Sequence, residues 1–158
     1  MRKTIIGSES INQRQDTEQG WLDLEKLAAI EVTSEDPDFP IESALTICEG
    51  SAGWRAAERG SQIIRLVFDK PRAIHQIRLE FSDADNSRTQ EFTLGWCPAG
   101  GPMRELVRQQ WTFSPRGSTR EIEDYHVDLN EVAMLELALK PDLTAENAFA
   151  TLTAWRVS

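Results

Sequence analysis

Apolar and polar residues alternate with a period of two over several stretches in the middle of the chain. The apolar positions are Ile64, Leu66 and Phe68, then Ile77, Leu79 and Phe81, then Phe92, Leu94 and Trp96, and then Val107, Trp111 and Phe113. Such alternation is typical of β-strands that bury one face and expose the other. Segments rich in Pro, Gly, Asp and Ser predict turns at residues 69–72, 98–102 and 114–118.

The C-terminal third continues the pattern with three more apolar stretches. They are Tyr125, Val127 and Leu129, then Leu135, Leu137 and Leu139, and then residues 149–157. Residues 130–139 could form a helix on propensity alone, but the neighbouring strands favour a strand. About eight short strands without a long amphipathic helix predict an all-β fold, an antiparallel jelly-roll β-sandwich. We expect its core to contain Ile64, Leu66, Phe68, Ile77, Leu79, Phe81, Phe92, Leu94 and Trp111.

The length of 158 residues suffices for one well-buried core but not comfortably for two. We expect a polar arm over residues 1–20 and a single sandwich domain over residues 21–158. The basic start is not followed by the apolar region of a signal peptide, which favours a cytoplasmic protein. Cys48 and Cys97 match neither a C-x-x-C pattern nor a zinc site. We expect two incidental thiols, although a disulfide between them stays open.

The charge balance is acidic. The formal net charge is -9 and the sequence pI is near 4.7. This charge repels polyphosphates and anionic lipid surfaces unless a local basic patch overrides it. We therefore expect neither a nucleic acid nor a membrane as the partner.

Three short motifs precede the first long strand. They are Val32-Thr33-Ser34, the sequence Pro-Ile-Glu-Ser-Ala-Leu at residues 40–45, and Trp54 in the following loop. In this order of motifs the chain resembles the discoidin-type, galactose-binding-like β-sandwich family over roughly residues 27–157. The resemblance implies a binding module whose ligand site is formed by three loops at one end of the barrel. By position these loops are residues 34–39, 54–61 and 82–89.

The three loops carry the candidate ligand-binding residues. These residues are Asp36, Phe39, Trp54, Arg55, Arg59, Asp83, Asp85 and Arg88. Arginine forks bind carboxylates, phosphates and sugar hydroxyls, so the three arginines would converge on a ligand if the loops cluster. The alternative is that they pair on the surface with Glu58, Asp83 and Asp85.

A metal site is not expected. Residues 83–86 read Asp-Ala-Asp-Asn, with oxygen ligands at alternating positions, but they lack the glycine and the bidentate glutamate of an EF-hand. A solvated hairpin tip is the better interpretation. Many carbohydrate-binding members of the family hold a structural calcium with a Leu-Asp-Gly-type segment and a late Glu. Here those positions read Leu-Thr at residues 45–46 and Ala-Trp-Arg-Val at residues 154–157, so we expect no metal and no cofactor.

Catalysis is not expected either. His75 and His126 have no Ser or Cys partner in a recognisable nucleophile motif. We therefore predict a non-catalytic binding module that holds a glycan or a protein partner. One alternative is a nucleic-acid repair or accessory domain, because a DNA-break-repair scaffold also uses this fold; it would require a basic face and strongly salt-dependent binding. Another is an unrecognised enzyme, which would require a pocket with convergent titratable groups.

Overall fold

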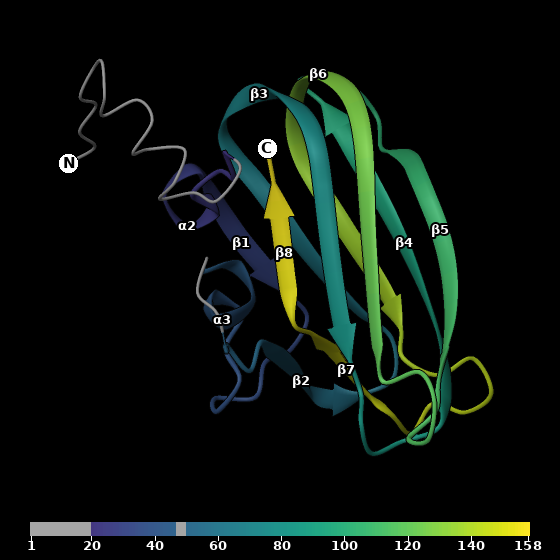
Figure 1. The fold of residues 1–158 in the computed structure, drawn as a ribbon. Coiled ribbons are helices and arrows are strands. Elements are labelled where there is room, and N and C mark those ends of the chain that lie inside the picture. The colour runs from purple at the N-terminus through teal and green to yellow at the C-terminus, as the bar shows by residue number, and fades with distance from the viewer. Residues whose placement is uncertain (1–19, 47–49) are drawn as a thin grey trace.

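The computed structural model describes residues 20–46 and 50–158, and these residues form mainly strands (Figure 1). Among them are two four-residue helices, α2 (Leu24–Leu27) and α3 (Glu42–Leu45). The strands are β1 (Ala28–Val32), β2 (Trp54–Arg59), β3 (Gln62–Ser82), β4 (Arg88–Pro98), β5 (Arg104–Phe113), β6 (Arg120–Lys140), β7 (Phe149–Leu152) and β8 (Ala154–Val157). Neither helix is long and apolar enough to cross a membrane. Residues 1–19 of the predicted arm lie outside the described residues. Cys48, one of the two cysteines, lies outside them too.

All strand pairs of the described residues are antiparallel. One sheet has the order β1-β3-β6-β4-β5, with β8 also paired to β3, and a small second sheet contains β2 and β7. The first part of β3 pairs with β1 and with the last part of β6, whereas the last part of β3 pairs with β8 and with the first part of β6. Both long strands curve over at the same end of the molecule (Figure 1), so each contributes to both layers of the sandwich.

The turn predicted at residues 69–72 is wrong, because β3 continues through this segment. The pairing of β3 with β6 shifts register between Val67 and Gln76, which is where the strand bends. Pro71 is exposed there, and an irregular position tolerates a residue without a backbone N–H. On β6, Glu131 has a φ of 53°, and its carbonyl accepts a hydrogen bond of 2.9 Å from the Ala99 N–H. The helix considered for residues 130–139 does not form, and the strand preferred there is confirmed.

The core is built from the predicted alternation. Eight of the nine predicted core residues are buried, and the Phe81 and Phe92 rings lie 5.3 Å apart between centroids. The exception is Trp111, which packs against the core but is only partly buried. Trp111 lies on β5, an edge strand, and Phe113 on the same strand is fully buried instead. The core also includes residues of the N- and C-terminal segments, among them Trp21, Leu24, Leu45 and Trp155.

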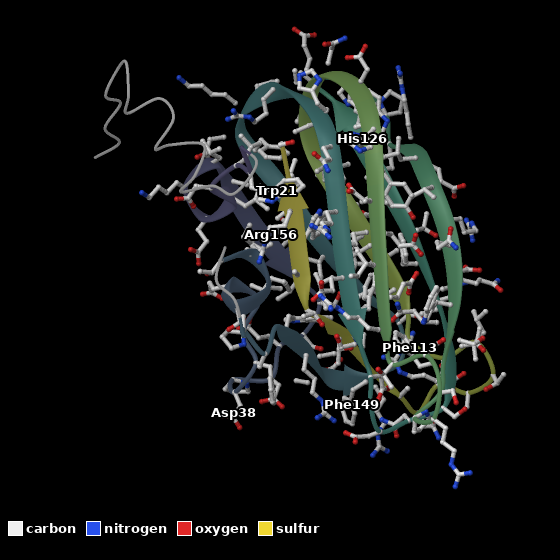
Figure 2. The ribbon with its side chains drawn as sticks, viewed as in Figure 1. Trp21, Asp38, Phe113, His126, Phe149 and Arg156 are labelled. Carbon is white, nitrogen blue, oxygen red and sulfur yellow. The ribbon has the colours of Figure 1, made fainter. Side chains whose placement is uncertain are left out.

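A side chain from the last strand holds α3 in place. The Arg156 guanidinium donates hydrogen bonds to the carbonyl oxygens of Ala44, at 2.9 Å, and Thr46, at 3.0 Å. Carbonyls at a helix C-terminus lack partners within the helix and need an external donor. Figure 2 shows Arg156 between β8 and α3. The guanidinium therefore links the segment before β2 to β8.

Candidate functional site

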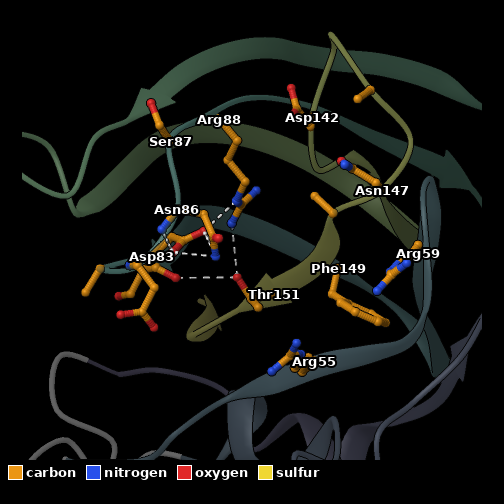
Figure 3. Close-up of a pocket in the computed structure, with 15 residues that line it drawn as sticks. Arg55, Arg59, Asp83, Asn86, Ser87, Arg88, Asp142, Asn147, Phe149 and Thr151 are labelled. Carbon is orange, nitrogen blue, oxygen red and sulfur yellow. Dashed lines mark hydrogen bonds and ion pairs between the residues drawn. The ribbon is translucent and has the colours of Figure 1, made fainter.

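An open cavity of about 630 Å³ lies where three segments meet at one end of the sandwich (Figure 3). The segments are β2, the connection from β3 to β4, and residues 142–151 before and within β7. The end of the molecule is opposite the bend of β3 and β6 (Figure 1). The polar side chains of its lining are Arg55, Arg59, Ser82, Asp83, Asp85, Asn86, Ser87, Arg88, Asp142, Asn147 and Thr151, and one aromatic side chain, Phe149, joins them.

Arg88 is a buried residue in the lining of the cavity. It alternates in phase with the buried Phe92 along β4, which turns its side chain inward, and the residue is only 5% exposed. Its Nε donates to Asp83 Oδ2 at 2.7 Å, and its Nη1 donates to the Pro141 carbonyl at 2.7 Å. The guanidinium also lies 4.7 Å from the centroid of the Phe113 ring. With so many partners already engaged, Arg88 is a structural cation that fixes the connection from β3 to β4.

Asp83 is the counter-ion of Arg88 and shapes the loop. Its Oδ1 accepts hydrogen bonds of 3.0 Å from the backbone N–H groups of Asp85 and Asn86. Partial burial alone would raise the pKa of Asp83, but the hydrogen bond from Arg88 and those from the two backbone groups outweigh it and lower this pKa. Asp83 therefore remains ionised, and the loop of residues 83–87 is held in one shape.

Two guanidinium groups lie over the aromatic ring of Phe149. The Arg55 guanidinium carbon lies 4.8 Å from the centroid of the Phe149 ring, and that of Arg59 lies 5.2 Å from it. Strand pairing sets this arrangement, because Arg59 lies opposite Phe149 and Arg55 lies opposite Thr151 in the β2–β7 sheet. Cation–π contacts of this kind orient a guanidinium without neutralising its charge.

The strand that carries both arginines is anchored by the residues before it. Gly53 has a φ of 78°, and a Cβ atom there would lie 2.4 Å from the Leu152 carbonyl oxygen, so the close approach of β2 to β7 requires glycine. Trp54 is 1% exposed, and its indole N–H donates to the Ser34 carbonyl at 3.1 Å. Because successive side chains of a strand point to opposite faces, the inward Trp54 places Arg55 outward.

The loop of residues 34–39 supports β2 through its backbone. The Asp36 N–H donates to the Arg55 carbonyl at 2.9 Å, and the Arg55 N–H donates to the Phe39 carbonyl at 3.1 Å. The Ser34 hydroxyl accepts hydrogen bonds from the N–H groups of Ala57 and Glu58. The loop therefore fixes the backbone of Arg55 through two hydrogen bonds.

Five of the eight sequence-predicted site residues come together around the cavity, and three do not. Arg55, Arg59, Asp83, Asp85 and Arg88 line it. Trp54 is buried in the core, and Asp36 and Phe39 hydrogen-bond the backbone of Arg55 without lining the cavity. The sequence interpretation missed the contribution of residues 142–151, above all Asn147 and Phe149. Phe149 reaches β2 through a pairing with Arg59, ninety positions earlier in the chain, and no local pattern indicates such a pairing.

A buried carboxyl group lies outside the cavity. Glu121 on β6 is fully buried, its Oε1 accepts a hydrogen bond of 3.3 Å from Gln90 Nε2, and its Oε2 has no partner among the described residues. Burial, followed by the neighbouring Glu123, raises the pKa of Glu121 to about 9. Burial also raises the pKa of Tyr125, two residues beyond Glu123. Glu121 is therefore protonated and uncharged at neutral pH.

Comparison with known proteins identifies the fold. No family model and no curated protein sequence matches the chain. The structure is similar to the family 32 carbohydrate-binding module of Clostridium perfringens NanJ, solved in complex with galactose, with a TM-score of 0.63, 11% identity, and coverage of 87% of this chain and 96% of that module. It is also similar to the module CBM32-3 of a family 31 glycoside hydrolase from Clostridium perfringens, with a TM-score of 0.65, 18% identity, and coverage of 89% and 95%.

A third similar structure belongs to a different class of protein. Reduced XRCC1 bound to the catalytic domain of DNA polymerase β gives a TM-score of 0.56 and 18% identity, over 84% of this chain and 94% of that one. At these identities the similarity concerns the fold. The predicted discoidin-like, galactose-binding-like β-sandwich is confirmed.

Proposed function

We propose that this galactose-binding-like sandwich is a non-catalytic glycan-binding module, and that the sugar binds in the cavity between β2, residues 82–88 and residues 142–151. The observation that carries the proposal is the composition of the cavity lining. Guanidinium, carboxylate, amide and hydroxyl groups line the cavity, and groups of these kinds hydrogen-bond sugar hydroxyls. The volume of about 630 Å³ is within the range of small-molecule sites.

The rigidity of the site supports the same function. Arg88 and Asp83 hold the loop of residues 83–87, and Gly53 and Trp54 hold β2. Polar groups that are already positioned lose little conformational entropy when a ligand binds. The solved NanJ module holds galactose, which supports a sugar as the ligand of this chain too.

The test is a glycan array probed with the full chain, followed by isothermal titration of the glycans that bind. Asn147→Ala and Phe149→Ala should weaken binding, because both residues line the cavity. Arg104→Ala is a matched control, since Arg104 lies 5.3 Å from the Trp96 ring in a cation–π contact that is not part of the cavity. Mass spectrometry of the bound glycan after prolonged incubation should show it unchanged.

Two results would contradict the proposal. Absence of binding to every glycan of the array would refute the glycan-binding function. Tight binding that Asn147→Ala and Phe149→Ala leave unchanged, with both variants folded, would refute the assigned cavity. A protein partner is the second candidate, supported by the similarity to XRCC1, which was solved bound to a polymerase domain.

A further inference from the structure

Two cations of the cavity lack a counter-ion within the described part of the chain. Neither Arg55 nor Arg59 forms an ion pair with any described carboxylate, although both guanidinium groups lie over the ring of Phe149. Two like charges held beside the same ring repel each other, and the ring does not neutralise them. An anion placed between or above them would remove this repulsion.

The other charges of the cavity are already paired or lie elsewhere in it. Arg88 and Asp83 neutralise each other in a buried ion pair. Asp85 belongs to the loop of residues 83–87, and Asp142 follows β6, so both reach the cavity from segments other than β2. Figure 3 shows Arg55 and Arg59 beside Phe149 and Asp142 on a separate loop. The cavity is therefore polar, with its unpaired positive charge on β2.

We propose that the ligand is an acidic sugar, a uronic acid whose carboxylate binds Arg55 and Arg59 while its hydroxyls face the loop of residues 83–87 and Asn147. This inference rests on the proposed glycan-binding function and specifies the class of sugar.

The chemistry of the lining favours a single carboxylate. The planar guanidinium fork matches a carboxylate with two parallel hydrogen bonds. Asp85 and Asp142 disfavour a ligand with several negative charges, because such a ligand could not keep all of them near β2. The same carboxylates, together with Asn86 and Asn147, can accept or donate hydrogen bonds to neutral hydroxyls. A uronic acid combines one carboxylate with several hydroxyls and meets both requirements.

The experiment uses matched sugar pairs that differ only at C6. Galactose and galacturonate, glucose and glucuronate, and mannose and mannuronate are titrated into the full chain at neutral pH, and galactose 6-sulfate is included as an anion that is not a carboxylate. We expect at least one uronate to bind about ten- to a hundred-fold more tightly than its neutral partner, the range for a charged hydrogen bond. Arg55→Ala and Arg59→Ala should each reduce this preference, and Arg55→Lys should reduce it too, because lysine lacks the fork. Arg104→Ala should retain it.

The outcomes separate this inference from the proposed function. Equal binding of the neutral and acidic members of every pair would overturn the acidic-sugar inference and leave the glycan-binding function intact. Equal binding of galactose 6-sulfate and galacturonate would overturn the assignment of a carboxylate. Failure of all sugars to bind, neutral and acidic, on the array and in solution would overturn both. A preference that survives Arg55→Ala and Arg59→Ala, in variants whose melting temperatures match the parent, would overturn the roles of these two arginines.

Discussion

The buried carboxyl group of Glu121 makes the stability of the protein depend on pH in a way that one substitution should remove. Glu121→Gln replaces the carboxyl group with a neutral amide of nearly the same shape. The amide oxygen can still accept the hydrogen bond from Gln90. The substitution therefore keeps the packing and removes only the ionisable proton.

The size of the effect follows from the two states of the carboxyl group. Its ordinary pKa is 4.5, and in the folded chain burial and Glu123 raise the pKa of Glu121 to about 9. Between these values the folded chain keeps a proton that the unfolded chain releases, so the free energy of unfolding falls as pH rises. Each pH unit within this window contributes about 1.4 kcal/mol. From about pH 5.5 to about pH 8 the parent protein should lose on the order of 3 kcal/mol through this group, and Glu121→Gln should not.

Urea denaturation of both proteins across this pH range measures the difference. Subtracting the parent from the variant at each pH cancels the contributions of all other titratable groups that the substitution leaves unchanged. Glu25→Gln, at an exposed carboxylate on α2, is the control and should give a flat difference. If the difference between Glu121→Gln and the parent is also flat, Glu121 does not hold a proton in the folded protein and the reasoning fails.

Three further substitutions or conditions test other parts of the structure. Arg88→Met should lower the free energy of unfolding by about 3–5 kcal/mol in urea denaturation, because it leaves Asp83 charged and without its buried partner; a loss below about 1 kcal/mol would contradict this. Gly53→Ala should destabilise by more than about 1 kcal/mol, because the new Cβ meets the Leu152 carbonyl and φ is positive, and an unchanged melting temperature would be the contrary result. Melting in calcium and in a chelator should agree, because the oxygens of Asp83 already accept hydrogen bonds from Arg88 and from backbone groups; a rise of several degrees with calcium would show that this loop binds the ion.

The sequence was most informative where burial repeats every second residue. Ile64, Leu66, Ile77 and Leu79 are buried as their alternation predicts. Successive side chains of a strand point to opposite faces of the sheet, so only one register places all the apolar side chains on the core. The bend of β3 was not predictable in the same way. Lys70 and Pro71 have the composition of a turn, and only pairing with β6 on both sides of the bend keeps the segment in the sheet.

The same alternation of buried and exposed positions could have predicted part of the candidate site. Arg88 is in phase with Phe92 on β4, so its burial followed from the pattern that identified the core. Trp54 and Arg55 are neighbours on one strand and must face opposite ways, which excludes one of them from the cavity. The contribution of Phe149 could not be predicted from the sequence, because it depends on the pairing of β2 with β7, two short strands that are distant in the chain.

The passage of β3 and β6 through both layers has a consequence for how the protein comes apart. Neither layer can detach while the other stays intact, because the same two strands run through both and pair with each other on both sides of the bend, over residues 62–67 and 76–82 of β3. Backbone amides that these two strands pair with each other away from the bend should therefore exchange hydrogen only when the whole domain unfolds, whereas amides of the connection at residues 83–87 should exchange through local opening. Sequence changes in that connection would then alter what the cavity holds with little effect on global unfolding, provided that Asp83 keeps its bond to Arg88.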